Sequence, residues 1–337
     1  MFELKSRIDG DGVSGPPESI AFAKWVAYRN AFHPIAEAMT PTSAIRNLRP
    51  DAVQDFDGSL LMNEGVWIGV DIGGTKTAVL ISARPPSVLE RVEFPSLPEQ
   101  GPRSCSRVDQ RIIYELLSQH RIRISTVGGI GVSCGGPLDA FTGVIQAPPN
   151  LSSWIDIPIT TILRTEFGVP CRLENDANAG AVAEHRYGAG RGARNMVFLT
   201  MGTGLGAGII VDSRLYRGSQ GQAGEIGHVR LSPRGPIGYH KAGSVEGWAS
   251  GGGMAQLARQ RVEKAVLKGD STALVRVMEQ AGQLSARDVA AAGRGGDAVA
   301  RNIVRTTGNR LREALAILVD ILNPERIVIG GLALRLS

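Results

Sequence analysis

From residue 66 onward the chain alternates apolar runs with glycine-rich turns, and two of these units look alike. Val66–Val70 and Thr77–Ile81 are apolar runs typical of buried strands, and a glycine turn separates them. Met196–Thr200 and Ala207–Val211 repeat that arrangement in the second half. This repetition predicts a duplicated domain in which two glycine hairpins face each other across a cleft lined with backbone N–H groups.

Further patterns predict an α/β architecture. They are a strand at 128–133 ending in the turn 135–137, a helix at 177–185, an amphipathic helix at 298–322 stopped by Asn323-Pro324, and a strand at 326–329 entering Gly330-Gly331.

The first 65 residues lack this pattern. Gly-Asp-Gly and Pro-Pro breaks surround one predicted helix near 20–32, which should end at His33-Pro34. We therefore expect an N-terminal extension over 1–65, a smaller lobe over 66–180 and a larger lobe over 181–337.

Composition narrows the class of protein. The 43 glycines cluster beside apolar runs, which indicates tight turns near a ligand. The net charge of +5 comes from scattered residues without a dense basic block, so we expect no nucleic-acid partner. Three well-separated cysteines argue against a disulfide scaffold, and no apolar run reaches membrane-spanning length. We expect a cytoplasmic protein without a membrane partner.

The turn Asp71-Ile72-Gly73-Gly74-Thr75-Lys76 has chemistry suited to phosphate, although it lacks P-loop spacing. Glycines let successive backbone N–H groups approach phosphate oxygens, Thr75 adds a hydroxyl and Lys76 a positive charge. Asp71, at a strand end, is a candidate Mg²⁺ ligand through water. The alternative is an ordinary glycine hairpin. A second such turn at 202–206 favours phosphate binding.

Leu173–Ala179 places polar residues between a predicted strand and a predicted helix. Asp176 is a candidate general base, because phosphoryl transfer to a hydroxyl needs positioning and a proton acceptor. Asn175 or Asp176 is also well suited to cap the alanine-rich helix. Both roles are compatible.

Downstream, Glu225 and His228 are short-range partners that suit adjacent sugar hydroxyls. The alternative is a surface loop with a lone histidine. Glu246 is equally ambiguous, since by default it is a solvated carboxylate near a helix start.

Taken together, these motifs resemble the ROK family (repressors, open reading frames and sugar kinases) from about residue 66 to 331. The matching segments are Asp71–Lys76, Gly131–Asp139, Pro149-Asn150-Leu151 with Trp154, Asn175–Asn178, Gly202–Gly206 and Gly224–His228.

The resemblance implies an actin-like ATPase (ribonuclease H-like) fold and ATP- and Mg²⁺-dependent phosphorylation of a glucose-like hexose, usually on the 6-hydroxyl, by a homodimer. It implies Asp176 as general base. The implied sugar contacts are Asn150, Asn175, Glu225, His228 and Glu246. The implied nucleotide residues are Asp71, Gly73, Gly74, Thr75, Lys76, Gly202, Thr203, Gly204, Gly330 and Gly331.

The chain departs from the family pattern in two places. Family members commonly bind zinc through a histidine and three cysteines, whereas this chain has Ile237, Tyr239 and Ser244 at the cysteine positions. We therefore expect no zinc, because zinc needs several nitrogen or sulfur ligands. The sequence also ends at Ser337, where family kinases continue with a helix that covers the adenine, so we expect the nucleotide pocket to be partly incomplete.

Two other functions stay open. A sugar-responsive transcriptional regulator of the same family would need a winged helix-turn-helix, for which residues 1–65 look too short and too broken. A remnant that binds sugar without turnover would fit the short end. The sequence does not name the sugar: glucose, mannose and N-acylated or amino sugars all fit.

Overall fold

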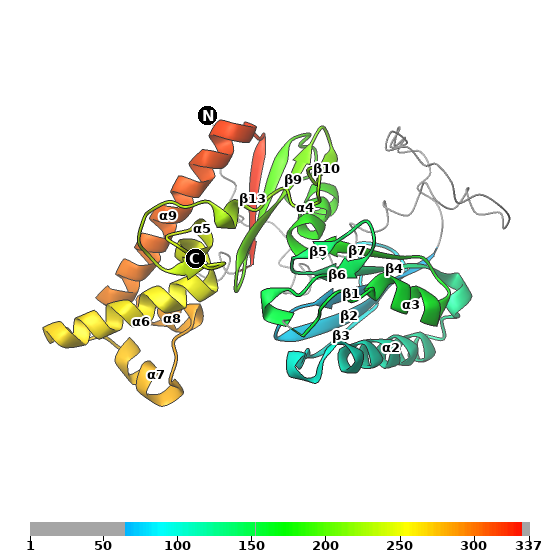
Figure 1. Cartoon of the computed structure of the whole chain (residues 1–337), viewed down its shortest axis with the longest axis horizontal. Coiled ribbons are helices and arrows are strands. Elements are labelled where there is room, and N and C mark those ends of the chain that lie inside the picture. Colours follow the sequence, from blue (N-terminus) through cyan, green and yellow to red (C-terminus); the bar gives the residue numbers. More distant parts are fainter. Residues whose placement is uncertain (1–64, 152, 332–337) are drawn as a thin grey trace. The chain divides into compact units, whose positions relative to one another are not determined.

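The computed structural model describes residues 65–151 and 153–331, which form two compact units, 65–175 and 176–331 (Figure 1). Each unit is built around its own mixed sheet. The helix expected near 20–32 and the C-terminal residues 332–337 lie outside the described residues.

The first unit holds a five-stranded sheet in the order β3-β2-β1-β4-β7. Its strands are β1 (Val66–Ile72), β2 (Lys76–Ser82), β3 (Glu90–Pro95), β4 (Val127–Cys134), β7 (Cys171–Asn175) and the small pair β5 (Leu138–Asp139) and β6 (Val144–Ile145). Its helices are η2 (Pro98–Gln100), α2 (Pro102–Gln119), η3 (Ile124–Thr126), η4 (Pro149–Leu151) and α3 (Ile159–Phe167). β1, β2 and β3 are antiparallel, whereas β1, β4 and β7 run parallel.

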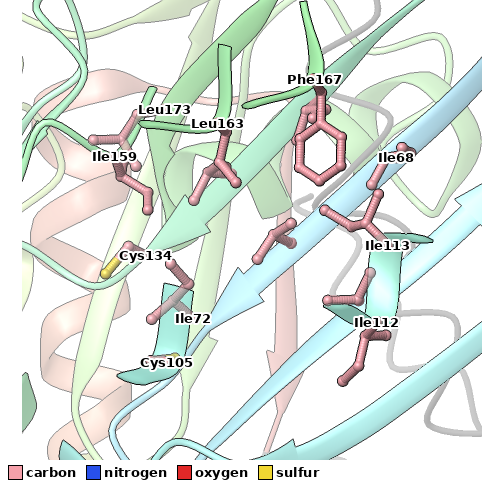
Figure 2. Packing of buried hydrophobic residues seen from close by; sticks show 14 of the residues in the cluster. Ile68, Ile72, Cys105, Ile112, Ile113, Cys134, Ile159, Leu163, Phe167 and Leu173 are labelled. Atoms are coloured by element: carbon pink, nitrogen blue, oxygen red, sulfur yellow. The ribbon is translucent and has the colours of Figure 1, made fainter. Parts of the chain in front are cut away.

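Alternation along β1 explains this unit's core. Ile68 and Ile72 are four residues apart, two full periods of a strand, so they lie on the same strand face, and they join a buried cluster with side chains of α2 and α3 (Figure 2). Ile113 of α2 and Leu163 of α3 are in that cluster. The helices therefore cover the sheet with apolar side chains, the arrangement expected of an α/β layer.

The second unit holds a four-stranded sheet in the order β10-β9-β8-β13. Its strands are β8 (Met196–Met201), β9 (Leu205–Val211), β10 (Arg214–Tyr216), β13 (Arg326–Gly331) and the hairpin β11 (Ile237–Gly238) and β12 (Lys241–Ala242). Its helices are α4 (Asp176–Tyr187), η5 (Ile226–His228), α5 (Val245–Ala249), α6 (Gly251–Lys268), α7 (Leu274–Ala281), α8 (Ala286–Arg294) and α9 (Ala298–Leu322).

The two sheets repeat one topology, which confirms the internal repetition predicted from the sequence. In each sheet an antiparallel hairpin around a glycine turn is extended by a parallel strand on its far side: β2-β1-β4 in the first unit and β9-β8-β13 in the second. Both turns are shorter than predicted, because the strands extend into them. Only 73–75 and 202–204 lie outside the strands, and Leu205 and Gly206 belong to β9.

The long helix α9 has the bounds predicted for it. Asp297 caps its N-terminus by accepting the backbone N–H of Ala300 at 2.8 Å. Asn323 ends it in the left-handed conformation, and Pro324 follows. Among the helices of residues 65–331, none combines the length and the apolar character needed to span a bilayer.

Candidate active site

Three parallel strands of the first unit end in one row. Ile72 of β1 lies opposite Cys134 of β4, which lies opposite Asn175 of β7. The first glycine turn, the turn 135–137 and the β7–α4 junction therefore leave the sheet at the same edge. Ligands of parallel α/β sheets bind at this carboxyl edge.

Ser96 holds the first glycine turn. Its hydroxyl donates to the carbonyl oxygen of Gly73 at 2.5 Å, and its backbone N–H donates to the carbonyl oxygen of Thr75 at 3.1 Å. Lys76 forms an ion pair with Glu93 of β3, with Nζ 2.7 Å from Oε1. Its charge is therefore shared with a neighbouring strand, which the sequence did not reveal.

Two predicted sugar contacts lie against turns of the first unit. A Cβ atom added to Gly74 would collide with the side chain of Asn150, so that turn and η4 are in direct contact. A Cβ atom added to Gly136 would lie 3.6 Å from Nδ2 of Asn175. Asn150 thus lies beside the first glycine turn, and Asn175 beside the turn 135–137.

Asp176 is the first residue of α4 and follows β7 directly. Small residues let α4 lie close to the sheet behind it. Ala177 and Ala181 contact the position where Gly208 of β9 has no side chain, and Gly180 lies on the ring of Phe198. Because such contacts leave little room for movement, α4 fixes the backbone of Asp176 firmly.

The second glycine turn is anchored to the start of α6. The carbonyl oxygens of Gly202 and Thr203 accept the N–H groups of Gly251 at 2.8 Å and Gly252 at 3.1 Å. These bonds satisfy two of the N–H groups that the first turn of a helix leaves without an internal partner. On the neighbouring strand, Gly330 and Gly331 lie opposite Thr200 and Met201, directly before the turn.

The segment 224–228 docks on the backbone of β9 through its glycines. Gly224 has φ +96°, and a Cβ atom there would collide with the carbonyl oxygen of Ala207. A Cβ atom on Gly227 would collide with the carbonyl oxygen of Leu205. Only glycine permits this approach, which brings Glu225 and His228 to the start of β9. The segment is therefore more than the surface loop considered as the alternative.

Glu246 is half-buried and its carboxylate accepts a hydrogen bond, so the default interpretation as a solvated carboxylate is wrong. Its Oε2 atom accepts the backbone N–H of Leu205 at 3.0 Å and lies 2.7 Å from the position of a Cβ atom on Gly204. Ser244 caps the same helix, because its hydroxyl accepts the N–H of Gly247 at 3.1 Å. Glu246 therefore ties α5 to the second glycine turn.

Carboxylates and one imidazole gather at this end of the second unit. Nε2 of His228 lies 3.6 Å from Oε2 of Glu225. Partial burial raises the pKa of Glu225, the nearby His228 lowers it, and the charges of Asp176 and Glu246 raise it further. Asp176 and Glu246 are thus close enough to Glu225 to act on its charge.

The structure therefore places the predicted site residues in two groups, one per unit. The first group is Asp71, Gly73, Gly74, Thr75, Lys76, Asn150 and Asn175; the second is Asp176, Gly202, Thr203, Gly204, Glu225, His228, Glu246, Gly330 and Gly331. No local pattern in the sequence signals the role of Ser96, which depends on contacts across the fold.

Glu246 allows a matched test of its two contacts. Glu246→Ala removes the acceptor for Leu205 N–H, and we expect a loss of about 1–3 kcal/mol in the free energy of unfolding. Glu246→Gln keeps an acceptor oxygen, so it should unfold near the original protein; because Glu246 is a predicted sugar contact, the variant should also bind sugar more weakly once the charge is lost. Urea unfolding and sugar titration separate the two effects. Equal destabilisation by both variants would contradict the assigned hydrogen bond.

Comparisons with known proteins agree with this arrangement. Residues 67–334 match the ROK family. A glucokinase of Halalkalibacterium halodurans is 34% identical over 272 residues, covering 80% of this chain and 81% of that protein. A ROK family glucokinase from Streptomyces griseus, solved in complex with glucose and AMPPNP, superposes with a TM-score of 0.65 at 29% identity, covering 79% of this chain and 83% of the other. A xylose repressor of Caldicellulosiruptor bescii is 30% identical over 206 residues, covering 61% of this chain and 50% of that protein. The actin-like α/β fold expected from the resemblance is thereby confirmed.

Proposed function

The chain belongs to the ROK family, and we propose that it is a kinase that transfers the terminal phosphoryl group of ATP to a hexose. Similarity to the glucokinases, one of them solved with glucose and AMPPNP, supports this activity. The observation that carries the proposal is the group at the start of β9, formed by Asp176, Glu225, His228 and Glu246.

Asp176 is the proposed general base. It accepts the proton of the sugar 6-hydroxyl while that oxygen forms a bond to the γ-phosphorus. The bond from this phosphorus to the β–γ bridging oxygen breaks, and ADP leaves with the electron pair. The close contact of α4 with β9 at Gly208 supports the assignment, because the reaction depends on accurate placement of the carboxylate.

Glu225, His228 and Glu246 are the proposed sugar contacts of the second unit. Carboxylates accept hydrogen bonds from hydroxyls, and the imidazole of His228 can donate or accept. Asn150 and Asn175 are the proposed contacts of the first unit. The three polar side chains of the second unit already suit a ligand with several adjacent hydroxyls, which favours a hexose over a simple alcohol.

The two glycine turns are the proposed phosphate sites. At both turns, hydrogen bonds occupy carbonyl oxygens: those of Gly73 and Thr75 accept from Ser96, and those of Gly202 and Thr203 accept from the start of α6. Because these bonds hold the carbonyl oxygens away from a ligand, fewer negative dipoles face it, and the turns are better suited to bind an anion. Asp71, at the end of β1, offers the hard oxygen that Mg²⁺ prefers and would hold it through water. When bound, Mg²⁺ offsets the negative charge of the phosphates.

A sugar-responsive regulator is the second candidate, favoured by the similarity to the xylose repressor over 61% of this chain. A regulator needs sugar binding but no phosphoryl transfer. Asp176 at the start of α4 favours the kinase, because a pure sensor has no use for a base there.

A coupled ADP-release assay over a panel of hexoses, with Mg-ATP fixed, tests the proposal. We expect sugar-dependent turnover with glucose or a close relative, and only background release without sugar. Glucose binding by calorimetry without any sugar-dependent ADP release across the panel would contradict the kinase and leave the regulator or the remnant.

A further inference from the structure

The zinc site of the wider family does not fit the residues of this chain. At the three cysteine positions, Ile237 has no ligating atom, Ser244 caps α5, and the ring of Tyr239 is stacked on His228. Across 65–151 and 153–331, no three or more His, Cys, Asp or Glu side chains are grouped so that they could hold a metal ion. His228 must therefore be held by other contacts.

We infer that the β11–β12 hairpin takes over this task, and that Tyr239 is a positioning residue that fixes the imidazole of His228 for sugar binding. The inference rests on the proposed function for its effect on sugar. Its structural part, a metal-free clamp on His228, stands on the contacts of the second unit alone.

Two contacts join the hairpin to His228. The rings of Tyr239 and His228 are stacked, with centroids 4.2 Å apart and planes inclined by 18°. Nζ of Lys241 donates to the backbone carbonyl oxygen of His228 at 2.8 Å. The first contact restrains the ring of His228 and the second restrains its main chain, so both the side chain and the backbone of this residue are fixed.

The backbone of the hairpin is strained where it makes the stack. Tyr239 and His240 form its two-residue turn and have φ values of 45° and 60°. Turns of this kind favour Asn-Gly, because residues other than Gly, Asn, Asp and His rarely adopt positive φ, and tyrosine is not among these. Strain of about 1–3 kcal/mol per residue persists only where neighbouring structure imposes it, and such strain clusters at functional sites.

The rest of the hairpin is bonded to the helices on which it lies. Gln256 of α6 binds both backbone groups of Ile237: its Oε1 accepts the N–H at 3.0 Å, and its Nε2 donates to the carbonyl oxygen at 2.8 Å. The hydroxyl of Ser244 donates to the carbonyl oxygen of Gly238 at 3.3 Å. A Cβ atom on Gly238 would lie 2.8 Å from Cβ of Glu246, so the hairpin also contacts the start of α5. These anchors impose the strained turn.

The stack covers one face of the imidazole, and Nε2 on its edge lies 3.6 Å from Glu225. Rotation of the His228 ring would break the contact with Tyr239. An aromatic side chain at 239 is therefore required, whereas its hydroxyl contributes nothing to stacking. This distinction separates a positioning role from a general packing role.

The experiment compares Tyr239→Leu with Tyr239→Phe, which carry the same backbone strain but differ in the ring. In NMR spectra of the free protein, the stack should shift the His228 ring protons upfield, and Tyr239→Leu should abolish this shift while Tyr239→Phe retains it. In kinase assays, Tyr239→Leu should raise KM for the sugar about three- to tenfold, with KM for ATP and kcat nearly unchanged. Tyr239→Phe should match the original protein.

The NMR shifts and the kinetic constants test different parts of the proposal. If the ring protons of His228 do not move in Tyr239→Leu, or if chelation by EDTA of a zinc-bearing protein moves them, the metal-free clamp is wrong. If they move but KM for the sugar is unchanged in an active kinase, the positioning role is wrong. If no hexose is turned over, the proposed function fails while the NMR result still decides the clamp.

Discussion

Replacement of Asp176 with asparagine is expected to lower kcat for sugar phosphorylation by about 10²–10⁴-fold. Asparagine has nearly the same shape and keeps the side-chain oxygen, but it cannot accept the proton of the attacking hydroxyl. KM for the sugar should change little, because Glu225, His228 and Glu246 keep their hydrogen-bonding groups. Steady-state ADP release and a sugar titration measure both quantities.

Asp212→Asn is a matched control for this variant. Asp212 lies in the same unit, where it pairs with Arg194 at 2.7 Å, and its side chain is 67% exposed. The same chemical change there should leave kcat unaltered, because an exposed ion pair contributes little. If Asp176→Asn turned over sugar at the original rate, Asp176 would not be the base, and another carboxylate of the group would have to replace it.

Replacement of Asp109 with asparagine is expected to change how stability depends on pH. Asp109 of α2 is fully buried, and neither of its carboxyl oxygens has a hydrogen-bond partner among the described residues. Burial raises its pKa from an ordinary 3.8 to about 7. The folded protein thus binds the Asp109 proton more tightly than the unfolded chain does.

The sign of the effect follows from that difference. The contribution of Asp109 is most favourable below pH 4, falls as pH rises, and levels off above about pH 7, where the folded carboxyl has lost its proton. The total change is about 4 kcal/mol, of which about 2 kcal/mol falls between pH 5.5 and pH 8. Asparagine does not titrate. The free energy of unfolding of the variant, relative to that of the original protein, should therefore rise by that amount between pH 5.5 and pH 8.

Urea unfolding of the two proteins at several pH values measures the effect, since the difference between them cancels the other titrating groups. Asp139→Asn is a suitable control, because hydrogen bonds with Thr142 lower the pKa of Asp139, so its difference from the original protein should stay constant from pH 5.5 to pH 8 and change only below about pH 5. A constant difference between Asp109→Asn and the original protein from pH 5.5 to pH 8 would show that Asp109 is hydrated or paired in solution.

Local patterns in the sequence predicted most of the framework. The period and length of the apolar runs predicted the hairpin strands. The same pattern, together with the residues that end the helix, predicted the bounds of α9. The order of the glycine motifs indicated the duplicated topology. Turn boundaries were less accurate, since Leu205 and Gly206 read as loop residues but pair with Met201 and Thr200 in the sheet.

The site was harder to predict from the sequence, because its geometry comes from contacts between segments that are far apart along the chain. Nothing local indicates that Glu246 binds the backbone of Leu205, 41 residues earlier. The sequence pattern assigned no role to Gly224 and Gly227 themselves, yet both are needed for close approach to β9. The stacking of Tyr239 on His228 likewise depends on a turn conformation that tyrosine rarely adopts.

The most direct test of the central claim is ³¹P and ¹³C NMR of a reaction containing the full chain, Mg-ATP and ¹³C-labelled glucose. We expect one new phosphomonoester signal that grows in step with ADP and is coupled to carbon 6 of the sugar. Bound glucose that stays unphosphorylated, or ADP formed at the same rate with and without sugar, would contradict it.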